Sequence, residues 1–398
     1  MAKKTVLLTV DALRQDYFSP EYFPNSWDTF SKHFSIFSNC HSHGTATPLA
    51  FPGLITGDLP DGDGSLNKDS VTLGELYEGR TIAHPNNPHL NSGRGYNRGI
   101  SEFQPEESTY LSRIKSIAGQ FDIVSHVYDI TMDKFGSSGM CPYTRAESLS
   151  SRIIDDLETS LDFLWAHYMD PHAPHTPSTL PDGDFPNSGN YYDDLSDRLH
   201  EEEASESDIL EFERLYGRHV RYLDRHLSRV LDKLKTTPWW EDALVVFVGD
   251  HGEAFGESGE YLHPWEGDPI ECVTNTPLAV KFPDQTTGKF DYLVKHSDIH
   301  SEIVTHATGN AAADEHALRT PSRMVVTKSN TSIRILSEDG QAIRRQDGTQ
   351  ATEGLVTDEM QDQLEDLSFP IVSLQSGDIP GGKQTNSVHN RLEALGYK

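Results

Sequence analysis

The sequence is poor in cysteine and has no long apolar run. Its 398 residues include only three cysteines, Cys40, Cys141 and Cys272, which show no Cys-x-x-Cys spacing and cannot all be paired. This usage favours a reducing compartment. No window approaches the ~18 apolar residues of a membrane span, and Met1–Val10 is typical of a strand, since it runs into Asp11 and lacks a signal-peptide cleavage site. We therefore expect a cytoplasmic protein without a membrane span.

Basic residues are also scarce. Lys+Arg number 33 against 62 Asp+Glu, which gives a formal net charge of −29. Phosphate backbones and anionic membranes would repel such a surface, which excludes a nucleic-acid binder with a basic face and argues against membrane docking. The acids are spread along the chain, as a salty cytoplasm favours, because salt screens their repulsion. We expect a halophilic, haloarchaeal source, with an ordinary acidic enzyme as the alternative.

The chain shows no low-complexity tract and no coiled-coil heptads. Its length allows two or three domains, or one large α/β domain with an appendage. Thr5–Val10 and Ala243–Val248 are continuous apolar runs, typical of strands buried on both faces of a parallel sheet. Ile209–Lys235 and Ser150–Trp165 show helical spacing of apolar residues. The pattern predicts an α/β fold with a mostly parallel central sheet flanked by helices.

The sequence pattern changes beyond about residue 320. Met324–Thr327 and Ser332–Leu336 are short strand-like runs, and Asp358–Leu367 has helical character. This predicts an antiparallel hairpin in a small C-terminal α+β subdomain. We expect a catalytic domain over 1–320, and a small subdomain with a tail over 321–398.

Two other segments have a distinct composition. Residues 177–208 are acidic and rich in Gly and Pro, which predicts a surface excursion or a lid over a site. The tail contains a short helical segment, Val388–Leu395, among Gly, Ser and Asn.

Two acidic residues and a histidine follow the two clearest strands. Asp11 comes directly after the first strand, at the sheet edge where ligands gather in α/β folds, although a helix N-cap is the commoner use of such a residue. Asp250 and His251 follow the later strand and offer one oxygen and one nitrogen ligand on a tight turn. Gly252 would let the backbone close around an ion.

A hydroxyl precedes a predicted helix. Thr47 reads as an N-cap, with Pro48 at the first helical position, which is a common way to open a helix. The same geometry could serve chemistry, because free N–H groups and the positive end of the helix dipole would stabilise an alkoxide at Thr47 and an anionic substrate group.

Together these residues resemble the sulfatase-like branch of the alkaline phosphatase superfamily, from about residue 4 to about residue 310. The resemblance lies in the order of a strand ending in Asp11, Thr47 followed by a helix ending in Leu-x-Thr-Gly, and a late Asp-His-Gly-Glu after a strand. Further matching stretches are Asn87–Leu90, Gly95–Gly99, His167–Pro174, Gly252–Gly259 with His263, and Asn275–Val280. The resemblance implies an alkaline-phosphatase-like fold.

The resemblance also implies site residues. The metal ligands would be Asp11, Thr47, Asp250 and His251. Thr47 would be the nucleophile, and His172 and His263 would bind the anionic group or protonate the leaving oxygen. Asn87 and Arg14 would bind substrate. Three oxygens and one imidazole suit Ca²⁺, Mg²⁺, Mn²⁺ or Zn²⁺. We expect one divalent metal ion, with Asp170 as a second-site ligand in the less favoured alternative.

The departures from the sulfatase pattern bear on the substrate. Sulfatases carry Cys or Ser in a Cys/Ser-x-Pro-x-Arg motif that matures to formylglycine, whereas this chain has Thr47 and lacks the arginine. It also has Ala12 where sulfatases usually carry a second acid. We therefore expect no formylglycine, and we expect a hydrolase that uses a covalent Thr47 intermediate on a small anionic ester. Phosphate monoesters, diesters or phosphonates are favoured over sulfates.

Two other functions are alternatives. A phosphoryl or headgroup transferase could use the same site, although such an enzyme would normally carry a membrane anchor. A catalytically silent metal-binding homologue should have lost a ligand, and all four positions are filled. The sequence does not decide whether the protein forms a homo-oligomer.

Overall fold

The protein is built around a central nine-stranded sheet. The computed structural model describes residues 3–105, 143–173, 195, 198–199, 204–263, 265–309 and 317–370. The strand order is β10-β2-β9-β6-β1-β5-β3-β4, with β11 also paired to β2. The strands are β1 (Thr5–Val10), β2 (Ser35–His41), β3 (Thr81–His84), β4 (Glu102–Phe103), β5 (Phe163–Tyr168), β6 (Leu244–Gly249), β9 (Asn275–Lys281), β10 (Gly288–Phe290) and β11 (Val294–Lys295). Only β9 runs antiparallel to its neighbours, β2 and β6.

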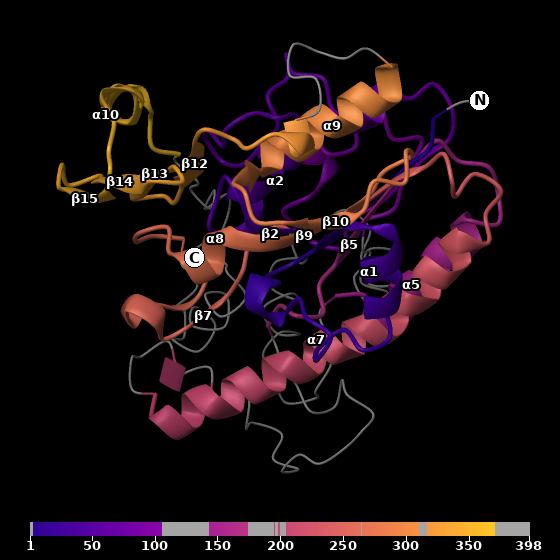
Figure 1. The fold of residues 1–398 in the computed structure, drawn as a ribbon, viewed down its shortest axis with the longest axis horizontal. Coiled ribbons are helices and arrows are strands. Elements are labelled where there is room, and N and C mark those ends of the chain that lie inside the picture. The colour runs from indigo at the N-terminus through magenta and orange to yellow at the C-terminus, as the bar shows by residue number, and fades with distance from the viewer. Residues whose placement is uncertain are drawn as a thin grey trace, which may run out of the picture.

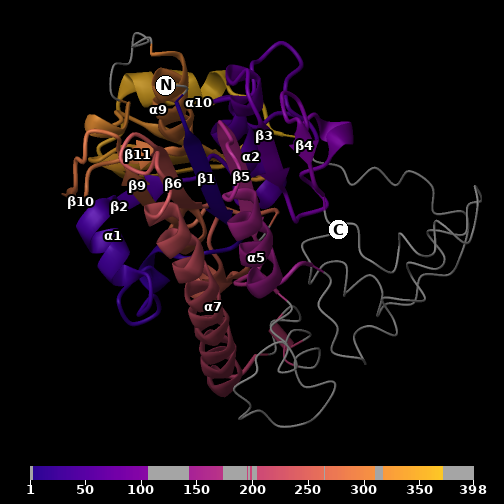
Figure 2. The same ribbon diagram turned by 90° about the vertical axis from the view of Figure 1, so that its right-hand side faces the viewer.

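Helices cover both faces of this sheet (Figure 1). One layer contains α2 (Thr47–Ile55) and α9 (His296–Thr308), and the opposite layer contains α1 (Trp27–His33), α5 (Ala146–Asp156) and α7 (Glu206–Lys235). Figure 2 shows α5 and α7 running along the same face. Two large apolar clusters fill the two interfaces. This is the mostly parallel α/β architecture that the sequence predicts.

The central strands place the ends of three elements at one edge. Every residue of β1, β5 and β6 is buried, as continuous apolar runs predict. β1 pairs in parallel with both neighbours, so that Val10 lies between Tyr168 and Gly249. The residues that follow these three strands, including Asp11 and Asp250, therefore emerge side by side.

The predicted helix Ser150–Trp165 is wrong in its second half. The helix α5 ends at Asp156, and Phe163–Tyr168 is a fully buried strand paired with β1 and β3. A short apolar run buried on both faces has no period-2 alternation, so its spacing cannot distinguish a strand from a continuing helix. The other long helix begins three residues earlier than predicted, at Glu206, because Ser205 caps it through a bond from the Asp208 backbone N–H.

A second, four-stranded antiparallel sheet follows the main one in sequence and confirms the predicted hairpin. Its strands are β12 (Val325–Lys328), β13 (Ser332–Leu336), β14 (Gly340–Arg345) and β15 (Gln350–Gly354), and α10 (Asp358–Asp366) packs on it. Most of 177–203 and all of 388–395 lie outside the described residues. Within the described ranges, no helix has the length and apolar character needed to cross a membrane.

The small sheet is bonded to the segment that precedes α2. The Lys328 N–H donates to the His43 carbonyl, the Thr45 N–H donates to the Lys328 carbonyl, and the Thr327 hydroxyl donates to the Ser42 carbonyl at 2.7 Å. The buried Arg334 donates to the Thr274 hydroxyl. These bonds fix the loop from which α2 starts.

A buried histidine, His43, and a half-buried one, His306, make the folded state sensitive to acid. His43 donates from Nδ1 to the Val326 carbonyl at 2.7 Å, and His306 donates from Nε2 to the Lys4 carbonyl at 3.1 Å. Burial lowers the pKa of each imidazole to about 4. The unfolded chain takes up protons on these rings below about pH 6.5, whereas the folded chain does so only near pH 4. Stability is therefore lost as the pH falls through this interval.

We expect the free energy of unfolding, measured by urea denaturation, to fall between pH 6.5 and pH 4, with up to about 1.4 kcal/mol per pH unit from each such histidine. The substitution His306→Gln keeps an N–H donor but cannot titrate. It should remove about one proton from the uptake on unfolding and make the slope shallower. Equal slopes in the wild type and the variant would show that His306 is already charged in the folded state.

Candidate active site

The turn after β1 presents Asp11 at the sheet edge. Its backbone N–H continues the pairing with β5 by donating to the Tyr168 carbonyl at 2.8 Å. Ala12 then adopts a left-handed conformation with φ 54°, which is uncommon outside glycine. The buried Tyr216 of α7 holds this turn, because its hydroxyl donates to the Ala12 carbonyl at 2.7 Å and accepts from the Arg14 N–H at 2.9 Å.

The turn after β6 presents Asp250 and His251. Asp250 Oδ1 accepts the N–H groups of His251 at 2.7 Å and Ala12 at 3.2 Å, which joins the two turns. His251 Nδ1 donates to the Gly252 carbonyl at 2.9 Å, and this leaves the Nε2 lone pair available. A Cβ on Gly252 would lie 2.0 Å from the Cys272 carbonyl oxygen. The glycine is therefore required by a close backbone approach.

Thr47 is the first residue of α2, and the N-cap is Ala46. The sequence prediction of Thr47 as N-cap is therefore wrong by one residue. Its hydroxyl makes no capping bond and instead faces the two turns, donating to Asp11 Oδ2 at 3.2 Å and lying 3.4 Å from His251 Nε2. Thr47 is 4 % exposed.

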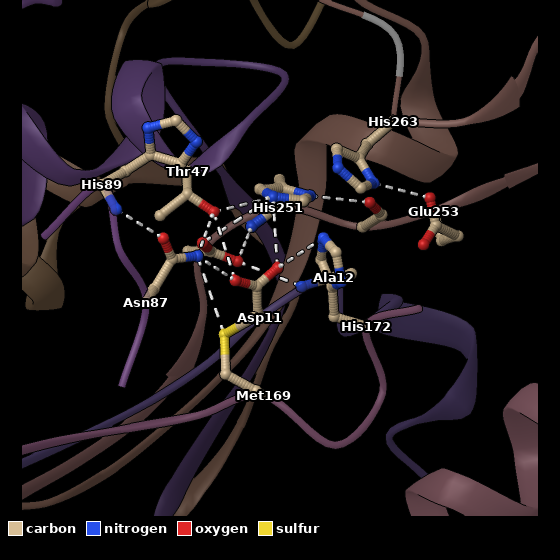
Figure 3. A network of polar contacts seen from close by, with 12 residues as sticks. Asp11, Ala12, Thr47, Asn87, His89, Met169, His172, His251, Glu253 and His263 are labelled. Atoms are coloured by element: carbon tan, nitrogen blue, oxygen red, sulfur yellow. Dashed lines mark hydrogen bonds and ion pairs between the residues drawn. The ribbon is translucent and has the colours of Figure 1, made fainter. Parts of the chain in front are cut away.

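In each of the two carboxylates, Asp11 and Asp250, one oxygen accepts hydrogen bonds and the other has no partner among the described residues. Asp11 Oδ2 accepts from Thr47, from Asn87 Nδ2 at 2.8 Å and from His167 Nε2 at 3.1 Å. By contrast, Asp11 Oδ1 and Asp250 Oδ2 are buried and have no hydrogen-bond partner among the described residues. His251 Nε2 lies 3.5 Å from the first of these oxygens and 3.7 Å from the second. Figure 3 shows the Asp11 carboxylate close to the His251 ring.

This arrangement fits a divalent cation. A buried carboxylate oxygen without a partner is costly, and two of them lie here beside an imidazole lone pair and a hydroxyl. Three oxygens and one nitrogen suit several divalent metals. The structure therefore brings the four residues expected as ligands, Asp11, Thr47, Asp250 and His251, into one group. Asp11, His167 and Asp250 also have ligand-type atoms within 4.8 Å of one another.

The electrostatics of the site separate the two acids. Burial favours the neutral form of Asp11, but His172, His167 and His251 outweigh it and hold its pKa well below the usual range. Burial and the neighbouring Asp11 charge raise the pKa of Asp250 well above that range. Burial, with His263 nearby, lowers the pKa of His251 to about 3, so this imidazole is neutral and able to bind a metal.

The two other expected histidines lie beside this group. His172 Nδ1 donates to the Ala173 carbonyl at 2.6 Å, and His263 Nδ1 donates to Glu253 Oε1 at 2.8 Å. The ring of His263 lies 5.0 Å from that of His172 and 4.6 Å from that of His251, measured between centroids. The Nε2 atom of His172 lies 4.0 Å from Asp11 Oδ1.

Asn87 joins the group and Arg14 does not. Asn87 Nδ2 lies 3.4 Å from the Thr47 hydroxyl, in addition to its bond with Asp11. The Arg14 guanidinium donates to both oxygens of Asp16, to Glu257 Oε1 at 2.7 Å and to the Glu253 carbonyl at 2.9 Å. These contacts direct the arginine toward the loop after Asp250, so its assignment to substrate binding stays a prediction.

Three residues near the site were not singled out by the sequence prediction. His167, the last residue but one of β5, bonds to Asp11. Glu253 is fully buried, and burial raises its pKa to about 7 despite the nearby histidines. His89 is bonded through its backbone N–H to Asn87 Oδ1 at 2.9 Å. Each lies in a stretch that matches the family pattern, which was the one signal available. Asp170, the less favoured second-site ligand, is instead buried beside Arg145 at 3.1 Å.

Comparisons with known proteins identify the family of this chain. The family model described as Sulfatase matches residues 3–309. A sulfatase of Formosa agariphila is 35 % identical over 72 residues, which is 18 % of this chain and 13 % of that protein. A choline-sulfatase of Rhizobium meliloti is 27 % identical over 86 residues, 22 % of this chain and 16 % of that protein. These matches span only a small part of either relative.

Solved structures share the fold over nearly the whole chain. The phosphonate monoester hydrolase of Agrobacterium radiobacter superposes with a TM-score of 0.62 at 16 % identity, covering 90 % of each chain. An alkaline phosphatase superfamily protein of Vibrio parahaemolyticus gives 0.60 at 13 % identity, covering 99 % of this chain and 85 % of that one. A 2-O GAG sulfatase gives 0.62 at 14 % identity, covering 92 % and 90 %.

The family match covers more than half of the chain and ends within a few residues of the predicted limits. The superposed proteins share its overall fold. The protein is therefore a member of the sulfatase family.

Proposed function

We propose that this protein is a metal-dependent hydrolase of phosphate or phosphonate esters that works through a covalent intermediate on Thr47. The observation that carries the proposal is the position of the Thr47 hydroxyl, 3.2 Å from Asp11 Oδ2 and 3.4 Å from His251 Nε2, beside two buried carboxylate oxygens without partners. Membership of a family of metal-dependent ester hydrolases supports it.

The side chains divide the work of the reaction. Asp11, Asp250, His251 and Thr47 would hold one divalent cation, which supplies Lewis acidity for the nucleophile and neutralises substrate charge. The Thr47 hydroxyl loses its proton to solvent, and its oxygen forms a bond to phosphorus while the bond to the leaving oxygen breaks. His263 or His172 gives that oxygen a proton. Water then attacks the phosphorus, the bond from Thr47 breaks, and the same histidine takes up a proton.

The choice of phosphorus over sulfur rests on the nucleophile. Threonine cannot be converted to formylglycine, so the sulfatase route through that group is closed to Thr47. A phosphonate monoester hydrolase is among the proteins of similar fold, together with sulfatases, at identities that show the fold alone. The convergence of all four expected ligands supports an active enzyme over a silent homologue.

Thr47 should be essential for turnover. Nitrophenyl esters of phosphate (mono and di), phosphonate and sulfate would be tested with Mn²⁺, Ca²⁺, Mg²⁺ or Zn²⁺. We expect Thr47→Ala to lose at least about 10³-fold in kcat on the best substrate, because no oxygen remains to attack. Thr47→Ser keeps the hydroxyl and should retain measurable activity. Acid-quenched wild-type protein should carry a phosphoryl group on Thr47 by mass spectrometry.

Thr45→Val is the matched control, because the Thr45 hydroxyl is equally buried two residues away and has no hydrogen-bond partner among the described residues. Its activity should stay near that of the wild type. Turnover that survives in Thr47→Ala would reject Thr47 as the nucleophile, and turnover of the sulfate ester alone would reject the phosphorus preference.

A bound metal should stabilise the fold through the two carboxylates. At a hundredfold excess of metal over its Kd, the wild type should gain about 2.7 kcal/mol in the free energy of unfolding. Asp250→Asn removes one of two facing buried charges, so without metal it should be at least as stable as the wild type. With metal it should gain nothing. Without metal, the thermal midpoint of Asp250→Asn should equal or exceed that of the wild type. With metal, the midpoint of the wild type should be the higher of the two.

The control for this reversal is Glu338→Gln, which removes one charge from an exposed position and should respond to metal like the wild type. If chelator and metal leave the wild-type midpoint unchanged, the proposed metal site is wrong.

A further inference from the structure

A chain of buried hydrogen bonds lies directly beneath the carboxylate of Asp11. Trp165 Nε1 donates to the Thr9 hydroxyl oxygen at 3.1 Å, this oxygen lies 2.9 Å from His167 Nδ1, and His167 Nε2 lies 3.1 Å from Asp11 Oδ2. Thr9 lies in β1, Asp11 directly follows it, Trp165 and His167 lie in the neighbouring β5, and none of the four is more than 1 % exposed. Trp165, Thr9 and His167 therefore lie in line behind Asp11, a proposed metal ligand. Among the described residues, this chain of hydrogen bonds reaches Asp11 Oδ2 and leaves Asp11 Oδ1 without a hydrogen-bond partner.

The donor and acceptor properties of these side chains set the direction of the hydrogen bonds from Trp165 to Asp11. An indole N–H can only donate, so the Thr9 oxygen accepts from Trp165 and its own proton is available for another acceptor. His167 Nδ1 at 2.9 Å is closer to it than the Ala166 carbonyl oxygen at 3.3 Å. With Nδ1 as acceptor, the ring proton sits on Nε2 and points at Asp11 Oδ2. A nitrogen that carries this proton has no lone pair for a metal.

Aromatic packing holds the same ring from the side. Phe51 of α2 meets His167 edge to face, with centroids 5.0 Å apart, and also contacts Trp165 at 5.5 Å. Because α2 begins with Thr47, the His167 ring lies between the helix that carries this proposed nucleophile and the carboxylate of Asp11.

We infer that His167 is a positioning residue for the metal site, directed by Thr9 and Trp165, and is not itself a metal ligand. Its Nε2–H, with Asn87 and Thr47, occupies Asp11 Oδ2 and thereby turns Oδ1 toward Asp250 and His251. This inference rests on the proposed metal-dependent function. Hydrogen bonds to metal-ligating side chains commonly contribute roughly 10- to 100-fold to metal affinity.

The test uses amide side chains that mimic one ring nitrogen each. In His167→Gln the amide N–H can take the place of Nε2 and donate to Asp11, whereas in His167→Asn the amide group reaches only the place of Nδ1. Mn²⁺ affinity of the full chain would be measured by electron paramagnetic resonance, which needs no substrate. We expect His167→Asn to weaken binding roughly 10- to 100-fold and His167→Gln to recover most of that loss.

A second pair of variants tests the direction from Thr9. Thr9→Ser keeps the hydroxyl and should bind Mn²⁺ like the wild type, while Thr9→Val keeps the shape and loses the hydroxyl, and should bind several-fold more weakly. Far-ultraviolet circular dichroism of each variant confirms folding. Spin-echo modulation of bound Mn²⁺ should show one directly bonded imidazole nitrogen in the wild type, and it should disappear in His251→Ala.

The other outcomes overturn the inference. Equal weakening in His167→Gln and His167→Asn, together with equal effects of Thr9→Ser and Thr9→Val, would reduce the chain to packing. Two bonded imidazole nitrogens in the wild type, one of them lost on changing His167, would make His167 a ligand. If wild type binds Mn²⁺ no more tightly than Asp250→Asn, the metal-dependent function fails, and the positioning role fails with it.

Discussion

Two acidic side chains buried face to face are the constraint on which the rest of this structure depends. Removing carboxylates from water is expensive unless their oxygens are bonded, yet Asp11 and Asp250 each keep one oxygen without a hydrogen-bond partner in the part of the chain that the structure describes. The other oxygen of each is saturated, by three side-chain donors in one case and by two backbone N–H groups in the other. The protein thus spends stability to hold negative charge at one point, a cost that a cation would offset.

The sheet explains why these groups meet. Asp11 and Asp250 follow adjacent parallel strands in register, so the fold delivers them to one edge without long side-chain reach. The left-handed Ala12 then turns the chain sharply, and Arg14 leaves the site to bind Asp16 and Glu257. The closeness of Arg14 to Asp11 in sequence therefore did not predict where the arginine side chain lies. The direction of the chain after Asp11 depends on the φ angle of Ala12 and on Tyr216 of α7.

The predictable parts of the fold and the site have local causes. Thr5–Val10 is a continuous run of β-branched residues and leucine, and the strand ending at Gly249 is apolar. The positions of Asp11 and Asp250 at the strand ends follow from that pattern. Phe163–Tyr168 has the same burial, but its first three residues are included in the predicted helix Ser150–Trp165 because they follow an amphipathic stretch. Because this strand is absent from the prediction, His167 is also missing from the predicted site. Its proposed role depends on its contact with Thr9 on the neighbouring strand, and residue spacing within one segment cannot predict such a contact.

The loop ahead of α2 has a consequence for how the protein is made. Its carbonyls and N–H groups are bonded to Thr327 and Lys328, and the Thr327–Ser42 bond joins residues 285 positions apart. On a ribosome that adds about 5–20 residues per second, the partners of this loop emerge on the order of 15–60 s after it does. The segment that sets Thr47 in place is therefore completed late, so a nascent chain holds Asp11 and Asp250 close together before it holds Thr47 in place.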